Sequence, residues 1–209
     1  MRIVLLGATG KVGRLVLQRA LEQGHEVTAL VRNPAKINRT HDSLTVKTGN
    51  LKDPAVMAEA MVGQDAVISA LGHKSFKKSD IQTAATRAVL ANIKPGQRFI
   101  SLTHQGVTDP NDPPPTVDNR LITAGIKLIP GSLYADSAEH ARLMRESSAD
   151  WVLVRSPVMT SGAPTHRYRT GYLRLGLSTT ARRADVADFL VANVSGDTWL
   201  RQSPMIAST

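Results

Sequence analysis

The sequence predicts an α/β protein whose mostly parallel sheet is covered by helices on both faces. Short apolar runs alternate along the chain with segments of helical periodicity, which is the pattern of β-α-β units. The first run, Arg2–Leu6, is continuously apolar from Ile3 onward, as expected for a strand buried on both faces of a sheet. A glycine-rich turn follows the first run directly, where sheets of this kind bind ligands.

Six strands are expected to form the body of the sheet, with a short seventh near the end of the chain. They are expected at Arg2–Leu6, Glu26–Val31, Leu44–Lys47, Ala66–Ala70, Arg98–Thr103 and Trp151–Arg155, with the short one near Trp199–Gln202. The helices between them are expected at Lys11–Gln23, Pro54–Met61, Asp80–Ile93, Asp136–Ser148 and Ala184–Asn193.

Two segments interrupt this alternation. Asp109–Asp118 carries four prolines, and Thr160–Ser178 is rich in glycine, threonine and arginine, so both are expected to be loops. Each follows a late strand and would lie over the carboxyl edge of the sheet. We therefore predict one domain over residues 1–209, with a substrate pocket built from loops at about 104–135 and 157–183.

The composition excludes several classes of site. The chain has no cysteine, so disulfides, thiol nucleophiles and cysteine metal sites are excluded. Its six histidines show no ligand spacing, and no metal site is predicted. No stretch approaches the roughly 18 apolar residues of a membrane span. A cytoplasmic protein without a membrane partner is expected.

The formal net charge of +9 is spread along the chain, except between Trp151 and Ala184. That region has no acidic residue and six arginines, among them Arg155 and Arg183. It is interpreted as a solvated basic surface, as a pocket wall for an anionic ligand, or as a nucleic-acid surface. Only 4% of the residues are aromatic, which disfavours nucleic acid as a partner.

The turn Gly7-Ala8-Thr9-Gly10-Lys11-Val12-Gly13 carries the strongest chemical signal. One glycine permits the tight turn, the next lets the backbone approach a pyrophosphate, and the third lets the helix pack against the strand. The helix N-terminus offers unpaired N–H groups to phosphates. The turn therefore predicts dinucleotide binding by a doubly wound, Rossmann-type fold.

The end of the second strand indicates NADPH rather than NADH. An NAD site places Asp or Glu there to bind the ribose 2′-hydroxyl, whereas this chain has Arg32, followed by Lys36. A guanidinium binds a 2′-phosphate through charged hydrogen bonds that contribute about 1.5–3 kcal/mol each. Asn50 and Leu51 follow the third strand, where adenine would lie. Leu71 and Gly72 follow the fourth, where glycine would let the backbone approach the cofactor.

These motifs together resemble a known family. GATGKVG, VRNP, GNLKD, ALG, DWVLVRSP and RRADVADFL occur in the order seen in atypical short-chain dehydrogenase/reductases. The resemblance is strongest to the NAD(P)H-binding, NmrA-like group, which includes biliverdin reductase B, a flavin reductase. It implies cofactor contacts from Gly7, Thr9, Gly10, Lys11, Val12, Arg32, Lys36, Asn50, Leu51, Leu71, Gly72, Thr103 and Pro157.

The Tyr-x-x-x-Lys pair of most short-chain reductases is absent, because Ala138 stands four residues after Tyr134. Hydride transfer to a flavin or quinone is therefore favoured over carbonyl reduction. Thr103 and His104 are the candidate catalytic residues. His104 is interpreted either as a proton donor or as a structural histidine, and His73 is a weaker candidate. Ser101 and Ser156 have no His/Asp partner at recognisable spacing, so a hydrolase is not predicted.

The sequence is compatible with two functions. The first is an NADPH-dependent oxidoreductase acting on a small, anionic or flavin-like acceptor such as FMN, as a monomer or homodimer. The second is a non-catalytic NADP(H)-binding sensor of the NmrA-like type. A sugar-nucleotide epimerase is disfavoured because the chain is short and lacks the tyrosine pair.

Overall fold

The computed structural model describes residues 1–72, 79–114, 132–176 and 178–209. Within this part of the chain, eight strands form one sheet in the order β3-β2-β1-β4-β5-β6-β10-β8. Their bounds are β1 Arg2–Leu6, β2 Glu26–Val31, β3 Leu44–Thr48, β4 Ala66–Ser69, β5 Arg98–His104, β6 Asp150–Ser156, β8 Tyr168–Gly171 and β10 Met205–Ser208. The first seven in spatial order are parallel, and β8 pairs antiparallel with β10. The strand order reverses beside β1, which is where open α/β sheets bind ligands.

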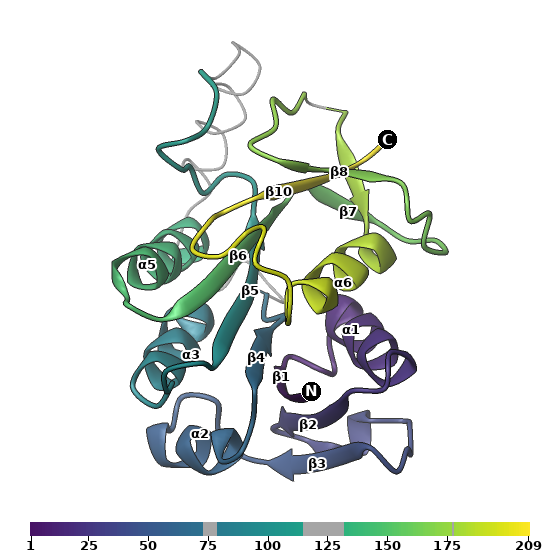
Figure 1. The fold of residues 1–209 in the computed structure, drawn as a ribbon, viewed down its shortest axis with the longest axis vertical. Helices are drawn as coiled ribbons and strands as arrows, with labels where there is room; N and C mark the ends of the chain where they lie inside the picture. Colours follow the sequence, from purple (N-terminus) through teal and green to yellow (C-terminus); the bar gives the residue numbers. More distant parts are fainter. Residues whose placement is uncertain (73–78, 115–131, 177) are drawn as a thin grey trace.

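Helices cover both faces of this sheet (Figure 1). Helices α1 (Lys11–Glu22) and α6 (Arg183–Ala192) pack together on one face. Helices α2 (Pro54–Met61), α3 (Ile81–Leu90) and α5 (Ser132–Glu146) lie on the other. A short 3-10 helix, η1 (Pro34–Lys36), follows β2. The predicted doubly wound, Rossmann-type fold is confirmed.

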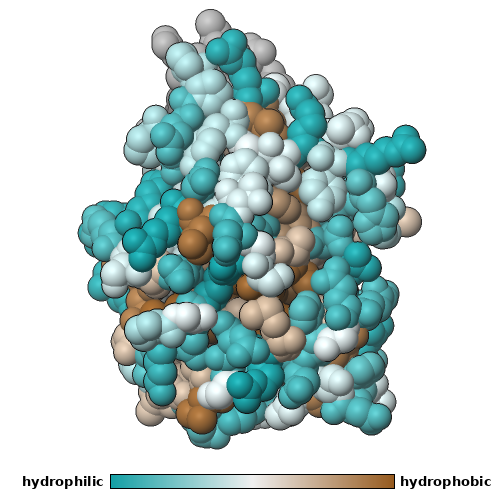
Figure 2. All heavy atoms as spheres, viewed as in Figure 1, coloured by the Kyte–Doolittle hydropathy of each residue, from teal (hydrophilic) through white to brown (hydrophobic). Residues whose placement is uncertain are grey.

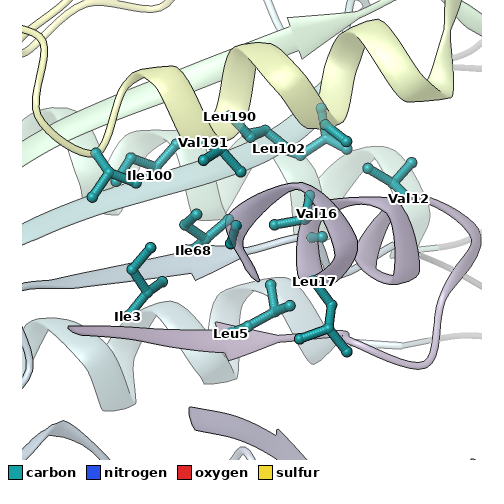
Figure 3. Close-up of a cluster of buried hydrophobic side chains, with 14 of the residues drawn as sticks. Ile3, Leu5, Val12, Val16, Leu17, Ile68, Ile100, Leu102, Leu190 and Val191 are labelled. Atoms are coloured by element: carbon teal, nitrogen blue, oxygen red, sulfur yellow. The ribbon is translucent and has the colours of Figure 1, made fainter. Parts of the chain in front are cut away.

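The core is divided by the sheet into two layers, because successive side chains of a strand point to opposite faces. In β1, Ile3 and Leu5 pack under α1 and α6, while Val4 and Leu6 pack toward α2, α3 and α5. Figure 3 shows the layer under α1 and α6, in which Val16 of α1 packs with Ile3 and Leu5 in one cluster. Strands that are buried on both faces explain the continuous apolar runs in the sequence.

The structure differs from the sequence prediction near the end of the chain. The final strand is Met205–Ser208, whereas Trp199–Gln202 forms a turn in which Gln202 makes one isolated bridge to Val152. Arg201 has φ of 56°, a left-handed conformation that interrupts an extended strand.

The predicted loop Thr160–Ser178 also contains regular structure. It includes β8, and β7 (Val158–Thr160) pairs in parallel with β9 (Thr180–Arg182) in a separate two-stranded sheet. These strands have three or four residues each, which is too short to show a periodic pattern in sequence.

The face of the molecule seen in Figure 2 is mostly hydrophilic, with small apolar areas between polar side chains. Within the described ranges, no helix combines the length and the apolar character needed to cross a lipid bilayer.

Candidate functional site

The glycine turn between β1 and α1 is a cradle of bare backbone. Gly7 has φ of +85°, and a Cβ atom added there would lie 2.8 Å from the carbonyl oxygen of Ala70. A Cβ on Gly13 would lie 2.0 Å from the carbonyl oxygen of Gly7. The N–H of Gly10 donates to that same oxygen at 2.8 Å. A side chain at Gly7 or Gly13 would therefore push apart the turn, the end of β4 and the start of α1.

The N-terminus of α1 suits an anion. Its N-cap, Gly10, supplies no side-chain acceptor, and the first turn contains no acidic residue. The first helical bond runs from the N–H of Arg14 to the carbonyl of Gly10. The N–H groups of Lys11, Val12 and Gly13 precede that bond and have no acceptor among the described residues. The turn thus fits the pyrophosphate that its sequence predicts.

Arg32 and Lys36 lie beyond the end of β2, on either side of the turn that η1 makes. Both are exposed, and neither forms an ion pair with a described residue. The side chain of Asn33 shapes this turn by accepting the N–H of Ala35 at 3.0 Å. Cations of this kind form charge-assisted hydrogen bonds with phosphate oxygens.

Arg14 connects these two parts of the site and was not predicted from the sequence as a site residue. Its Nε donates to the carbonyl of Thr9 at 3.4 Å, and its Nη2 donates to the carbonyl of Lys36 at 3.3 Å. Its position one residue after the third glycine, on the first turn of α1, was the available signal.

Asn50 and Leu51, which the sequence predicts beside adenine, differ in burial. Asn50 is exposed, and its Oδ1 accepts the N–H of Lys52 at 3.1 Å. Leu51 is buried in the core layer under α2. The ammonium of Lys52 forms an ion pair with Asp80 at the start of α3, which holds the pKa of that carboxyl below its usual value. This ion pair ties the loop after β3 to α3.

The ends of β4 and β5 are held together by Gln82 of α3. Its Nε2 donates to the carbonyls of Leu71 at 3.0 Å and Leu102 at 3.2 Å. Beside Leu71, a Cβ on Gly72 would meet no atom within 4 Å, so this backbone is open on that side. His73 lies outside the described residues.

The carboxyl end of β5 presents Thr103 and His104 side by side. Thr103 is 5% exposed, and its Oγ1 has no hydrogen-bond partner in the described part of the chain. A buried hydroxyl without a partner is unfavourable by about 1–3 kcal/mol, so a water molecule or a ligand group is expected to bind it. His104 Nδ1 accepts the N–H of Gly106 at 3.1 Å, so the neutral ring carries its proton on Nε2. The ring of Tyr134, in the first turn of α5, lies 6.1 Å from that of His104.

Ser101 has a histidine partner that its spacing in sequence did not reveal. Its Oγ lies 3.1 Å from Nε2 of His140, and Nδ1 of His140 lies 2.6 Å from Oγ1 of Thr86. All three side chains are 1% exposed, and burial lowers the pKa of His140 to about 4. The group joins β5, α5 and α3 inside the core, where no substrate reaches the serine, so it gives no support to a hydrolase.

Arg155 is not part of a pocket wall, which corrects one interpretation of the basic region. It is fully buried, and its guanidinium pairs with Asp112 through contacts of 2.6 and 2.7 Å. It also donates to the carbonyls of Val107 and Ser203, and its Cζ lies 5.7 Å from the ring centroid of Tyr172. Arg155 therefore fastens the loop after β5 to β6 and to the segment before β10.

The remaining arginines of the basic region differ in environment. Arg182 donates to the carbonyl of Ala163 and Arg183 to Oγ of Ser161, whereas Arg167, Arg169 and Arg174 are exposed. Pro157 is buried, and Val158 beside it is 71% exposed on β7. Part of the predicted pocket loop 104–135 lies outside the described residues. Among those described, no group of three or more His, Asp or Glu is placed to hold a metal ion.

Comparison with known proteins gives a family. A model described as NAD(P)H-binding matches residues 7–197. The chain is 29% identical over 144 residues to the uncharacterized protein YwnB of Bacillus subtilis, a match that covers 69% of this chain and 54% of YwnB. The matched part therefore spans about half of that relative.

Solved structures show the same fold. The anaerobillin reductase ChuY of Escherichia coli O157:H7 has a TM-score of 0.76 and 21% identity, covering 99% of this chain and 96% of ChuY. A putative NADH-flavin reductase from Streptococcus pneumoniae TIGR4 has a TM-score of 0.77 and 18% identity, covering both chains fully. The match to the family model agrees with the resemblance that the motifs predicted. This chain belongs to the NAD(P)H-binding family.

Proposed function

We propose that this chain is an NADPH-dependent oxidoreductase that reduces a small acceptor. One observation carries the proposal: the bare backbone of the glycine turn lies next to Arg32 and Lys36 at the end of β2, and neither cation forms an ion pair with a described residue. An NADH site would place a carboxylate at this strand end. Two proteins that share the fold are described as an anaerobillin reductase and a putative NADH-flavin reductase, which supports reductase chemistry for this chain.

The residues that would hold the dinucleotide follow the carboxyl ends of β1 to β6 in order. The pyrophosphate would be held by Gly7, Thr9, Gly10, Lys11 and Val12, the 2′-phosphate by Arg32 and Lys36, adenine by Asn50 and Leu51, and the nicotinamide half by Leu71, Gly72, Thr103 and Pro157. NADPH, when bound, supplies a hydride to the acceptor.

The chain's own residues would position the acceptor and handle the proton. The Nε2–H of His104 is a donor, since Nδ1 is already engaged with the N–H of Gly106. His104 would give this proton to the acceptor, with Tyr134 packed against its ring. Exposed Val158 offers an apolar surface to a flat ring such as a flavin or quinone.

An anionic acceptor such as FMN is supported by charge. Residues 157–183 contain five arginines and no Asp or Glu, and three of these arginines are exposed. A surface with an excess of positive charge raises the local concentration of anions.

A second candidate function is an NADP(H)-binding sensor without turnover. It is favoured by Ala138 on α5, in the position where most short-chain reductases have the lysine that lowers the pKa of the catalytic tyrosine. This absence removes one route of proton supply, and an oxidoreductase would then depend on His104 as the proton donor.

An assay of NADPH oxidation distinguishes the two functions. The absorbance of NADPH at 340 nm is followed with FMN, a quinone or dichlorophenolindophenol as the acceptor. Turnover with any acceptor, faster with FMN than with uncharged lumiflavin, supports the oxidoreductase and its anionic acceptor. Tight NADPH binding with no turnover across the panel supports the sensor. Failure to bind NADPH overturns both.

A further inference from the structure

We propose that Arg14 is a specificity-determining residue for the 2′-phosphate, acting beside Arg32 and Lys36. The inference rests on the proposed NADPH preference and extends it to a residue on a different element. Arg14 lies on α1, whereas Arg32 and Lys36 follow β2.

The geometry places the Arg14 guanidinium between the two halves of the site. One of its nitrogens reaches the carbonyl of Thr9 in the phosphate turn, and another reaches the carbonyl of Lys36 in η1. Any group bound between the turn and η1 therefore lies next to this guanidinium. The adenosine ribose has to lie there, because it connects the pyrophosphate on the turn with the adenine beyond β2.

The contacts of Arg14 leave most of its hydrogen-bonding capacity unused. A guanidinium has five N–H donors, and only Nε and Nη2 are engaged, at 3.4 and 3.3 Å. These distances exceed the usual 2.7–3.2 Å for N–H···O bonds. Nη1 makes no hydrogen bond with the described residues. The remaining donors suit phosphate oxygens, which a guanidinium binds in pairs.

The distribution of charge around Arg14 also favours phosphate binding. Residues 1–21 and 27–38, which include the turn, most of β2 and η1, contain no Asp or Glu, and none of Arg14, Arg32 and Lys36 pairs with a carboxylate in the described structure. The guanidinium of Arg14 contacts the backbone of Lys36, and Arg32 lies two residues before η1. A dianionic ester bound between α1 and η1 would be attracted by these positive charges.

The test compares NADP⁺ with NAD⁺, which differ by one phosphate ester, by calorimetric titration of the wild type and four variants. The variants are Arg14→Ala, Arg14→Lys, Arg32→Ala and, as a charge-matched control, the exposed Arg39→Ala in the same segment. Thermal unfolding of each variant confirms that it is folded.

We expect Arg14→Ala to weaken NADP⁺ binding about tenfold, the equivalent of one charged hydrogen bond, and to change NAD⁺ binding less than twofold. Arg14→Lys should restore part of the loss, and Arg39→Ala should change the ratio little. If Arg14→Ala weakened the binding of NADP⁺ and NAD⁺ equally, Arg14 would only hold the turn against η1, and the inference would be overturned. Unchanged affinity for both dinucleotides would also overturn it. If the wild type itself fails to prefer NADP⁺, or Arg32→Ala leaves its preference intact, the NADPH assignment fails as well.

Discussion

Gly13 of α1 lies so close to Gly7 that a Cβ atom on Gly13 would stand 2.0 Å from the Gly7 carbonyl oxygen. No real Cβ contact is that short, so the first turn of the helix packs directly on the backbone of the turn before it. The same carbonyl accepts the N–H of Gly10. The shape of the phosphate cradle and the placement of α1 are therefore one structural feature.

Replacing Gly13 with alanine should separate α1 from the turn. Overpacking of this kind destabilises a protein by about 1–3 kcal/mol, and here the obstructing atom is backbone that has little room to move. Urea unfolding should show the loss, and calorimetry should show that NADPH binding falls together with stability. A Gly13→Ala protein with wild-type stability and affinity would contradict the described packing.

Gly72→Ala is the matched substitution at the opposite side of the site. A Cβ there meets no protein atom within 4 Å, so the free energy of unfolding should change little. If the backbone of Gly72 lies against the dinucleotide, as we propose, the added methyl group should weaken NADPH binding by tenfold or more. Unchanged affinity in a folded Gly72→Ala protein would remove Gly72 from the cofactor site.

Asp112→Ala should be strongly destabilising. It leaves the guanidinium of Arg155, which is fully buried, without its carboxylate, and breaking a buried pair from one side costs about 3–5 kcal/mol. Glu59→Gln, which removes one partner of the exposed Lys47–Glu59 pair, serves as the control and should be near neutral. Equal urea midpoints for the two variants would show that Arg155 does not fasten the loop.

His140 should make stability fall as the pH is lowered. Burial lowers its pKa to about 4, against 6.5 in the unfolded chain, so the unfolded state takes up the proton first. The contribution is complete above pH 6.5, is lost progressively down to about pH 4, and totals roughly 3 kcal/mol. Urea unfolding at pH 7.5 and pH 5 measures it. His140→Gln, which cannot titrate, should lose less stability between these pH values than the wild type; an equal loss would assign the effect to other groups.

The sequence predicted the parts of the fold that local pattern determines. Strands β1 and β2 and helix α2 have the predicted bounds, because buried parallel strands are continuously apolar and Asp53-Pro54 is a strong helix start. The glycine turn was predictable for the same reason. Its chemistry depends on seven consecutive residues.

The parts that sequence missed depend on contacts between distant segments. Asp112 of the proline-rich loop reaches Arg155 across 43 positions, and Ser101 reaches His140 across 39. In a single sequence, neither spacing indicates that the two residues are in contact. Arg14 was missed for a related reason, since its contact with Lys36 appears only when α1 and η1 are placed side by side.

In the proposed function, the cations at the end of β2 select NADPH. The most direct test is calorimetric titration of the wild type and Arg32→Ala with NADPH and NADH at one salt concentration. We predict that the wild type prefers NADPH by roughly ten- to a hundredfold and that Arg32→Ala loses most of this preference while keeping its affinity for NADH. Equal affinities of the wild type for the two dinucleotides, or equal losses of both in Arg32→Ala, would contradict the account.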